Sequence, residues 1–245
     1  MIRIAAVGDI HMGPDSQGVL RPAFETLPDC ADVLLLAGDL TRHGTPEEAR
    51  VVAREIADLG VPVVAVLGNH DHHDDRPQEV TAILEDAGAH VLEGRSTIVT
   101  ADGNRLGVAG TKGFGGGFVG RSAGEFGEPL MKEFVRYSRR CADGLRTALE
   151  RLAGEDCDVR VALTHFSPVP ETLAGEPLEI YPFLGSYLLA EAIDTAGADL
   201  AVHGHAHAGT EHGMTSGGVR VRNVAQPVIG RAFHVYHVPV GARLP

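Results

Sequence analysis

Aspartate, asparagine and histidine recur at five places in this chain of 245 residues, each time directly after a short apolar run. These side chains offer carboxylate or amide oxygens and imidazole nitrogens, and no cysteine belongs to the set. Such donors suit hydrolytic divalent cations, and the series exceeds the four ligands that a single structural zinc requires. We therefore predict a site for two metal ions. Its predicted ligands are Asp9, His11, Asp39, Asn69, His165, His205 and His207.

The spacing within these segments supports a shared site. Asp9 and His11 are two residues apart, as are His205 and His207, and residues two apart on an extended chain point to the same side. Asp39 has two carboxylate oxygens and could bridge two ions. A capping aspartate or a hydrogen-bonded surface histidine explains any one segment, but it does not explain five in series.

Glycine accompanies several of these segments and completes a set of five sequence blocks. In chain order the blocks are Asp9-x-His11, Gly38-Asp39, Gly68-Asn69-His70-Asp71, His165 and Gly204-His205-x-His207. The series resembles the calcineurin-like metallophosphoesterase superfamily, and no ligand block is lost. The second block continues as Leu40-Thr41 and is similar to the branch of cyclic-nucleotide phosphodiesterases and uncharacterised prokaryotic phosphoesterases.

The resemblance implies a role for each residue. One ion would be held by Asp9, His11 and His207, and the other by Asn69, His165 and His205, with Asp39 bridging them. A solvent-derived hydroxide would also bridge the ions and attack phosphorus. His70 would be a catalytic residue that steadies the phosphoryl oxygens or protonates the departing alkoxide. We expect manganese at the site. Iron, zinc, cobalt and nickel are alternatives, because they also accept this donor set.

Three functions are compatible with these residues. The first is hydrolysis of small phosphodiesters such as cyclic nucleotides, which the branch resemblance favours. The second is phosphomonoester or nucleic-acid hydrolysis on the same centre, although a net charge of -12 disfavours a nucleic acid partner. The third is a protein-interaction module that keeps the scaffold, which the intact ligand blocks disfavour.

Two further segments are candidates for substrate choice. The glycine-rich stretch from Lys112 to Gly127 is expected to form a mobile lid, with Lys112 and Arg121 binding the substrate. A flexible surface loop is the alternative. The proline-rich stretch from Phe166 to Tyr181 is expected to form a stiff wall of the pocket.

These segments need a scaffold that brings strand ends together. Apolar, β-rich runs predict strands at 2–7, 33–36, 63–66, 160–163, 200–202, 219–224 and 233–238. Helices are predicted from Thr45 to about Leu59 and over 77–87, 130–152 and 186–195, the third interrupted at Asp143-Gly144. The turn Asp102-Gly103-Asn104 predicts an antiparallel hairpin between 96 and 110. We expect one α/β domain over residues 1–245, with two stacked mixed sheets flanked by helices in four layers.

Composition limits the cellular setting. The cysteines Cys30, Cys141 and Cys157 are odd in number and show no paired spacing, which favours a reducing compartment. No secretory signal precedes Asp9, and no apolar run approaches the ~20 residues that span a bilayer. We therefore expect a cytoplasmic protein with a small phosphate-ester substrate and no membrane partner. The sequence leaves the oligomeric state open.

Overall fold

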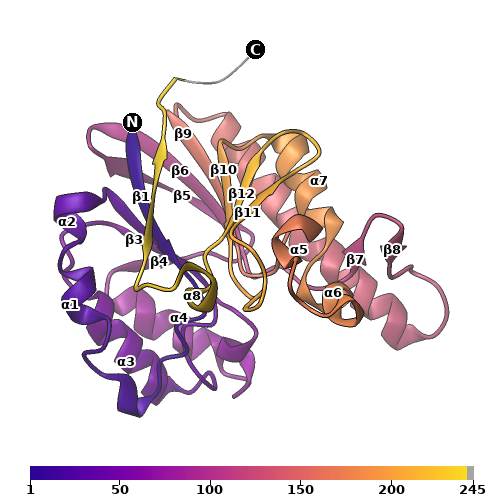
Figure 1. Cartoon of the computed structure of the whole chain (residues 1–245), viewed down its shortest axis with the longest axis horizontal. Coiled ribbons are helices and arrows are strands. Elements are labelled where there is room, and N and C mark those ends of the chain that lie inside the picture. The colour runs from indigo at the N-terminus through magenta and orange to yellow at the C-terminus, as the bar shows by residue number, and fades with distance from the viewer. Residues whose placement is uncertain (242–245) are drawn as a thin grey trace.

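Two mixed β-sheets lie face to face at the centre of the molecule, with helices on their outer sides (Figure 1). The computed structural model describes residues 1–241, so residues 242–245 of the predicted domain lie outside the described part. The predicted α/β architecture of stacked mixed sheets is confirmed.

The first sheet is parallel apart from one edge strand. Its order is β13 (His234–Val238), β1 (Ile2–Val7), β2 (Val33–Ala37), β3 (Val63–Val66) and β4 (Ala89–Val91). Strands β1 to β4 run parallel, and β13 pairs antiparallel with β1. The connecting helices are α1 (Arg21–Phe24), α2 (Leu27–Cys30), α3 (Pro46–Ile56) and α4 (Pro77–Asp86). The strand–helix alternation therefore predicted the parallel sheet correctly.

The second sheet combines parallel strands with two antiparallel edges. Its order is β11 (His212–Met214), β12 (Arg220–Asn223), β10 (Leu200–His203), β9 (Val159–Thr164), β6 (Asn104–Thr111) and β5 (Arg95–Ala101). The predicted hairpin is the β5–β6 pair. The helices of this half are α5 (Pro129–Ala153), α6 (Tyr181–Leu184) and α7 (Tyr187–Ala196), and α8 (Gln226–Ile229) connects β12 to β13 of the first sheet. The strands β7 (Gly117–Phe118) and β8 (Arg121–Ser122) form a separate small hairpin near α6 (Figure 1).

Two apolar layers hold these elements together. The larger one contains side chains from both sheets, including Leu34, Leu36, Leu106 and Leu163, all buried. Consecutive buried residues along β2 agree with a parallel strand that is covered on both faces. A second layer lies between the second sheet and the helices α5 and α7. The strand ends are therefore fixed by packing on both sides of each sheet.

Two features predicted for the helices differ from the structure, the end of α3 and the interruption of α5. Helix α3 begins as predicted, with Thr45 as its N-cap and Glu48 completing a capping box, but it ends at Ile56, before Leu59. Helix α5 is continuous across Asp143-Gly144. A Cβ on Gly144 would lie 3.2 Å from the Cα of Gly94, so this glycine allows the helix to approach the turn before β5 instead of interrupting the helix.

The strands that precede the ligand-bearing segments have their carboxyl ends at the same edge of each sheet. In the first sheet Val7 pairs with Leu36, and Ala37 pairs with Val66. In the second sheet β9 and β10 are parallel neighbours. Because the carboxyl ends of parallel strands meet at one edge of a sheet, all five segments reach the same edge of the two-sheet stack.

Candidate metal centre

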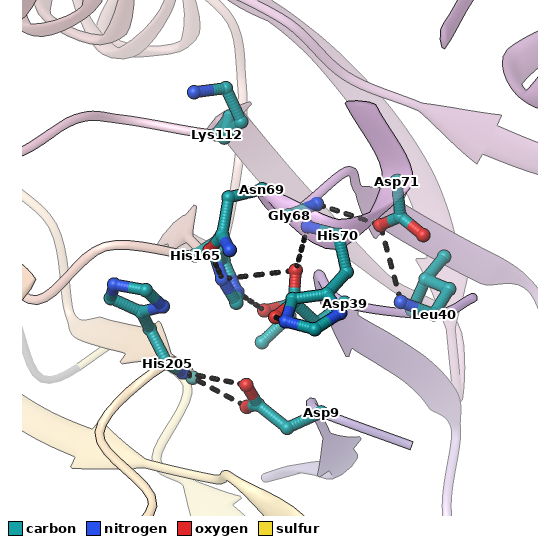
Figure 2. Close-up of polar contacts among 12 residues, drawn as sticks. Asp9, Asp39, Leu40, Gly68, Asn69, His70, Asp71, Lys112, His165 and His205 are labelled. Carbon is teal, nitrogen blue, oxygen red and sulfur yellow. Dashed lines mark hydrogen bonds and ion pairs between the residues drawn. The ribbon is translucent and has the colours of Figure 1, made fainter. Parts of the chain in front are cut away.

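The predicted ligands converge at the carboxyl ends of the strands, as Figure 2 shows for most of them. Their donor atoms form three overlapping groups, and within each group the atoms lie within 4.8 Å of one another. The groups are Asp9 with His11 and His207, His11 with Asp39 and His70, and Asp39 with His165 and His205. The first group is one of the two ligand sets that the family resemblance implied. The third contains His165 and His205 of the other set together with Asp39, and Asn69 of that set lies 3.0 Å from His165.

Asp39 lies at the middle of this arrangement. Its side chain is buried, and its two oxygens face different partners. Oδ1 is 3.3 Å from Nε2 of His165, whereas Oδ2 is 3.9 Å from Nε2 of His11 and of His70. The main-chain N–H of His70 also donates to Oδ1 at 2.8 Å. Asp39 therefore has the position that a bridging carboxylate requires.

The surroundings of His165 test whether a cation fits. Its Nδ1 donates to the carbonyl of Ala37 at 2.9 Å, so a neutral ring carries a lone pair on Nε2. That lone pair faces Oδ1 of Asn69 at 3.0 Å and the Asp39 carboxylate. Burial lowers the pKa of His165 well below its usual value, which keeps the ring neutral. Three electron-pair donors thus point at one another in a buried place, an arrangement that a cation between them would satisfy.

Asp9 is held by hydrogen bonds from the segment that follows β10. Its oxygens accept the main-chain N–H of His205 at 3.0 and 2.9 Å, and Nε2 of His207 lies 2.9 Å from Oδ1. Burial raises the pKa of Asp9 to about 6, although the hydrogen bond with His207 lowers it. The same hydrogen bond raises the pKa of His207. Asp9 follows β1 of the first sheet and His207 follows β10 of the second, so the centre joins both sheets.

Several ligand residues adopt a left-handed backbone. Asp9, His11, Asp39 and His205 have φ values of 57°, 41°, 50° and 72°. Such values are uncommon outside glycine, and they gather at sites where the surrounding structure enforces them. Main-chain hydrogen bonds do so here, because the N–H groups of Asp9 and His11 donate to the carbonyls of Gly38 and Asp39. The loops after β1 and β2 are therefore tied together.

Three glycines leave room for the ligands. A Cβ on Gly68 would lie 2.1 Å from Oδ1 of Asp39, and one on Gly204 would lie 2.3 Å from Oδ2 of Asp9. A Cβ on Gly38 would lie 2.6 Å from Nδ1 of His165. Each glycine of the sequence blocks is thus explained by space at the centre.

Burial favours the neutral forms of His11, His165 and His205. Burial, followed by the nearby His165, lowers the pKa of His205 to about 3. Burial also lowers the pKa of His11. Since a neutral imidazole has a lone pair for coordination, these environments prepare metal ligands. His205 Nε2 lies 3.3 Å from the carbonyl of Phe183, which leaves Nδ1 as the nitrogen available to an ion.

His70 is fixed at one nitrogen and open at the other. Its Nδ1 donates to the carbonyl of Arg42 at 2.8 Å, and its Nε2 faces Asp39. The ring stands edge-on to His11 at 4.5 Å between centroids. Nε2 is therefore the nitrogen that can act on a substrate or, alternatively, bind an ion.

Asp71 organises the loops on which the ligands lie. Its buried oxygens accept hydrogen bonds from the main chain of Leu40, Thr41 and Gly68 and from the Thr41 hydroxyl, over 2.6 to 3.2 Å. Figure 2 shows this carboxylate on the far side of His70 from Asp9. Burial, followed by the nearby Asp39, raises the pKa of Asp71 to about 6. Asp71 joins the loop after β2 to the loop after β3 and is not in any of the three ligand groups.

Replacing Asp71 with asparagine should weaken the centre without removing a ligand. The amide nitrogen cannot accept from the N–H groups that surround it, so both loops should loosen. We expect metal affinity to fall by about 10- to 100-fold, together with a lower unfolding temperature. Metal analysis and thermal unfolding measure the two effects. Asp75→Asn makes the same change on an exposed residue and is the control, and wild-type metal affinity in Asp71→Asn would contradict this role.

The two predicted substrate contacts lie in different surroundings, and their role in binding substrate stays a prediction. Lys112 is 4% exposed, and its ammonium lies 4.9 to 5.3 Å from the ring centroids of Phe114, Tyr137 and Phe166. This burial lowers the pKa of Lys112, and the Lys112 carbonyl accepts the main-chain N–H of His165 at 3.0 Å. Arg121 is exposed on the β7–β8 hairpin, so the predicted lid contains regular structure.

Other contributors were not visible in the sequence, because they are main-chain atoms. The carbonyls of Ala37, Arg42 and Phe183 orient three of the histidines. His203, the last residue of β10, is buried, and its Nε2 lies 2.9 Å from the Thr172 hydroxyl oxygen.

Solved structures share the fold at low sequence identity. A phosphopantetheinyl hydrolase of Mycobacterium tuberculosis superposes with a TM-score of 0.70 at 17% identity, covering 99% of this chain and 98% of that one. A protein of Thermus thermophilus gives a TM-score of 0.59 at 19% identity, covering 97% of this chain and 99% of that one. The chain therefore has a two-sheet α/β fold, with aspartate and histidine side chains gathered at the strand ends.

The family follows from the sequence comparison. The family model described as calcineurin-like phosphoesterase matches residues 2–209, and the chain belongs to this family. A probable cyclic nucleotide phosphodiesterase of Synechococcus sp. is 33% identical over 92 residues, which are 34% of each chain. A symmetrical bis(5'-nucleosyl)-tetraphosphatase of Burkholderia mallei is 44% identical over 69 residues, 28% of this chain and 23% of the relative. The chain thus matches about a third or less of the length of these relatives.

Proposed function

We propose that this protein is a phosphodiesterase that hydrolyses small phosphate esters with two bound metal ions. The observation that carries the proposal is the position of Asp39, which faces His165 with one oxygen and His11 and His70 with the other. Two ligand groups that meet at one carboxylate are what a pair of neighbouring cations needs. The named activities of the two curated relatives support phosphate-ester chemistry.

Two sets of side chains would bind the two ions. Asp9, His11 and His207 would hold one ion, and Asn69, His165 and His205 the other. When bound, the ions would supply Lewis acidity toward the phosphoryl oxygens and the activation of water. The neutral imidazoles and the Asn69 amide add no negative charge, so the centre would stay attractive to an anionic ester.

His70 would act on the substrate itself. With Nδ1 bound to the Arg42 carbonyl, a protonated ring presents the N–H of Nε2 to the centre. That group would donate either to a phosphoryl oxygen or to the departing alkoxide. Arg42 thus fixes the direction in which the proton is offered.

Metal-dependent hydrolysis of a diester tests this function. We expect the purified protein to bind about two equivalents of manganese and to hydrolyse bis(p-nitrophenyl) phosphate faster than p-nitrophenyl phosphate. Dialysis against a chelator should abolish turnover, and manganese should restore it. A preference for the monoester would favour a phosphomonoesterase, whereas metal binding without turnover of either ester would favour an interaction module.

Other aspects of the function remain predictions. We propose manganese as the native ion, a cytoplasmic location and one domain over the chain. None of the helices in residues 1–241 is both long and apolar enough to cross a membrane.

A further inference from the structure

Large apolar side chains are exposed at the end of the molecule that carries α6, the β7–β8 hairpin and the short 3-10 helix η4 (Leu178–Ile180) (Figure 1). Val119, Leu178 and Phe183 are 84%, 62% and 61% exposed. Single exposed apolar residues are ordinary, but several on adjoining elements mark a binding surface. The metal centre as described above uses none of these side chains.

These elements enclose a cavity of about 340 Å³, which we call the cap cavity. Its volume lies in the roughly 300 to 1,000 Å³ range of small-molecule sites. The residues that line it include Phe118, Val119, Arg121, Leu178, Tyr181 and Pro182. Arg121 is the one charged residue of the lining, and the Tyr181 hydroxyl already donates to the carbonyl of Leu173. The cap cavity therefore offers apolar surface and few polar partners.

Helix α6 contributes neighbouring residues to the cap cavity and to the metal centre. Pro182 lines the cavity, and the next residue, Phe183, presents its carbonyl to Nε2 of His205 at 3.3 Å. The carbonyl of Pro182 accepts the N–H of Gly116 at 2.7 Å, which fixes the base of the hairpin to the same helix.

A small apolar cluster makes a second connection. Phe118, another lining residue, packs with Ala206, Leu173 and Leu184. Ala206 lies between the predicted ligands His205 and His207. The wall of the cavity and the ligand segment after β10 are therefore parts of one packed unit.

We propose that the cap cavity binds an apolar group of the substrate, so that the substrate class is a phosphate ester carrying an alkyl or acyl chain. The inference rests on the proposed hydrolysis of phosphate esters at the metal centre. An ester bound there would extend its organic group along α6 into the cavity. A nucleobase fits less well, because its edge atoms need hydrogen-bond partners and the lining offers mainly apolar side chains.

Binding of alkyl phosphates tests this assignment without requiring turnover. Calorimetric titration of the manganese-loaded protein with a series from methyl to octyl phosphate should give affinities that rise about two- to fourfold per methylene until the cavity is filled. The double variant Val119→Ser, Leu178→Ser should lose most of this rise. Both residues are exposed, so the core is not disturbed.

The control is Val19→Ser, the same change at a valine that is 65% exposed near α1, and it should keep the wild-type rise. Equal affinities across the series, or an unchanged rise in the double variant, would overturn the proposal. So would a nucleoside monophosphate that binds more tightly than octyl phosphate and loses this advantage in the double variant. A protein that shows the rise but hydrolyses no ester would refute the proposed function, and with it the substrate class, while still showing that the cap cavity binds the alkyl chain of a phosphate ester.

Discussion

Asp39→Asn should lose both metal ions together and reduce diester hydrolysis by more than the roughly 10- to 100-fold that accompanies loss of a residue that only orients a ligand. The reason is the shared position of Asp39, whose two oxygens face imidazoles of different ligand groups. In asparagine one oxygen can still accept the N–H of His70, but an amide nitrogen then replaces the second donor. Metal analysis after dialysis and kcat/KM measure the two effects.

A matched control is available for this substitution. Asp58 has a φ of 52°, close to the 50° of Asp39, but it is exposed beyond the end of α3. Asp58→Asn therefore makes the same chemical change on the same kind of backbone and should keep metal content and rate. Loss of only one ion from Asp39→Asn, or wild-type activity with both ions present, would contradict the bridging role.

His70→Ala should keep its metal ions and slow turnover by about 10²- to 10⁴-fold, the range typical of general acid–base groups. The ring Nε2 faces the centre while Nδ1 is bound to Arg42, so the substitution removes a group that can donate to the substrate. Metal content and kcat for bis(p-nitrophenyl) phosphate are the two measurements, with His237→Ala on the exposed side of β13 as the control.

The choice of leaving group separates the two roles proposed for His70. If the ring protonates the leaving alkoxide, the variant should lose more activity on an ester with an alkoxide leaving group than on a p-nitrophenyl ester, because p-nitrophenolate departs without a proton. If the ring steadies the phosphoryl oxygens, both substrates should slow alike. Loss of an ion from His70→Ala would instead make His70 a ligand, and an unchanged rate would leave it structural.

Much of the centre could be predicted because each candidate ligand lies next to the apolar run that predicts its strand. Asp9 and Asp39 each follow an apolar run, and such runs predict the strands whose ends meet. His205 and His207 were expected to share one side of an extended chain. The structure brings both to the centre, but His205 has a φ of 72°, so a turn and not an extended segment places them there. The roles of these residues as ligands are still predictions, but the structure brings their donor atoms together.

The remaining features depend on contacts between distant segments, which a single sequence does not display. The carbonyls of Ala37 and Phe183 orient histidines that lie far from them in the chain. Lys112 looked like a lid cation, but the rings that bury it come from separate segments, including α5. The β7–β8 hairpin and α6 are too short for a periodic pattern to reveal, although they form the cap cavity.

The left-handed backbone at Asp9, His11, Asp39 and His205 has a consequence for how the protein would acquire its ions. Main-chain hydrogen bonds from Asp9 and His11 to Gly38 and Asp39 hold this backbone, so folding meets part of the entropic cost of arranging the donors. A set of donors arranged in this way can bind any of several transition metals with little rearrangement. Cellular metal supply, more than any reshaping of the loops, would then decide which ion the protein carries.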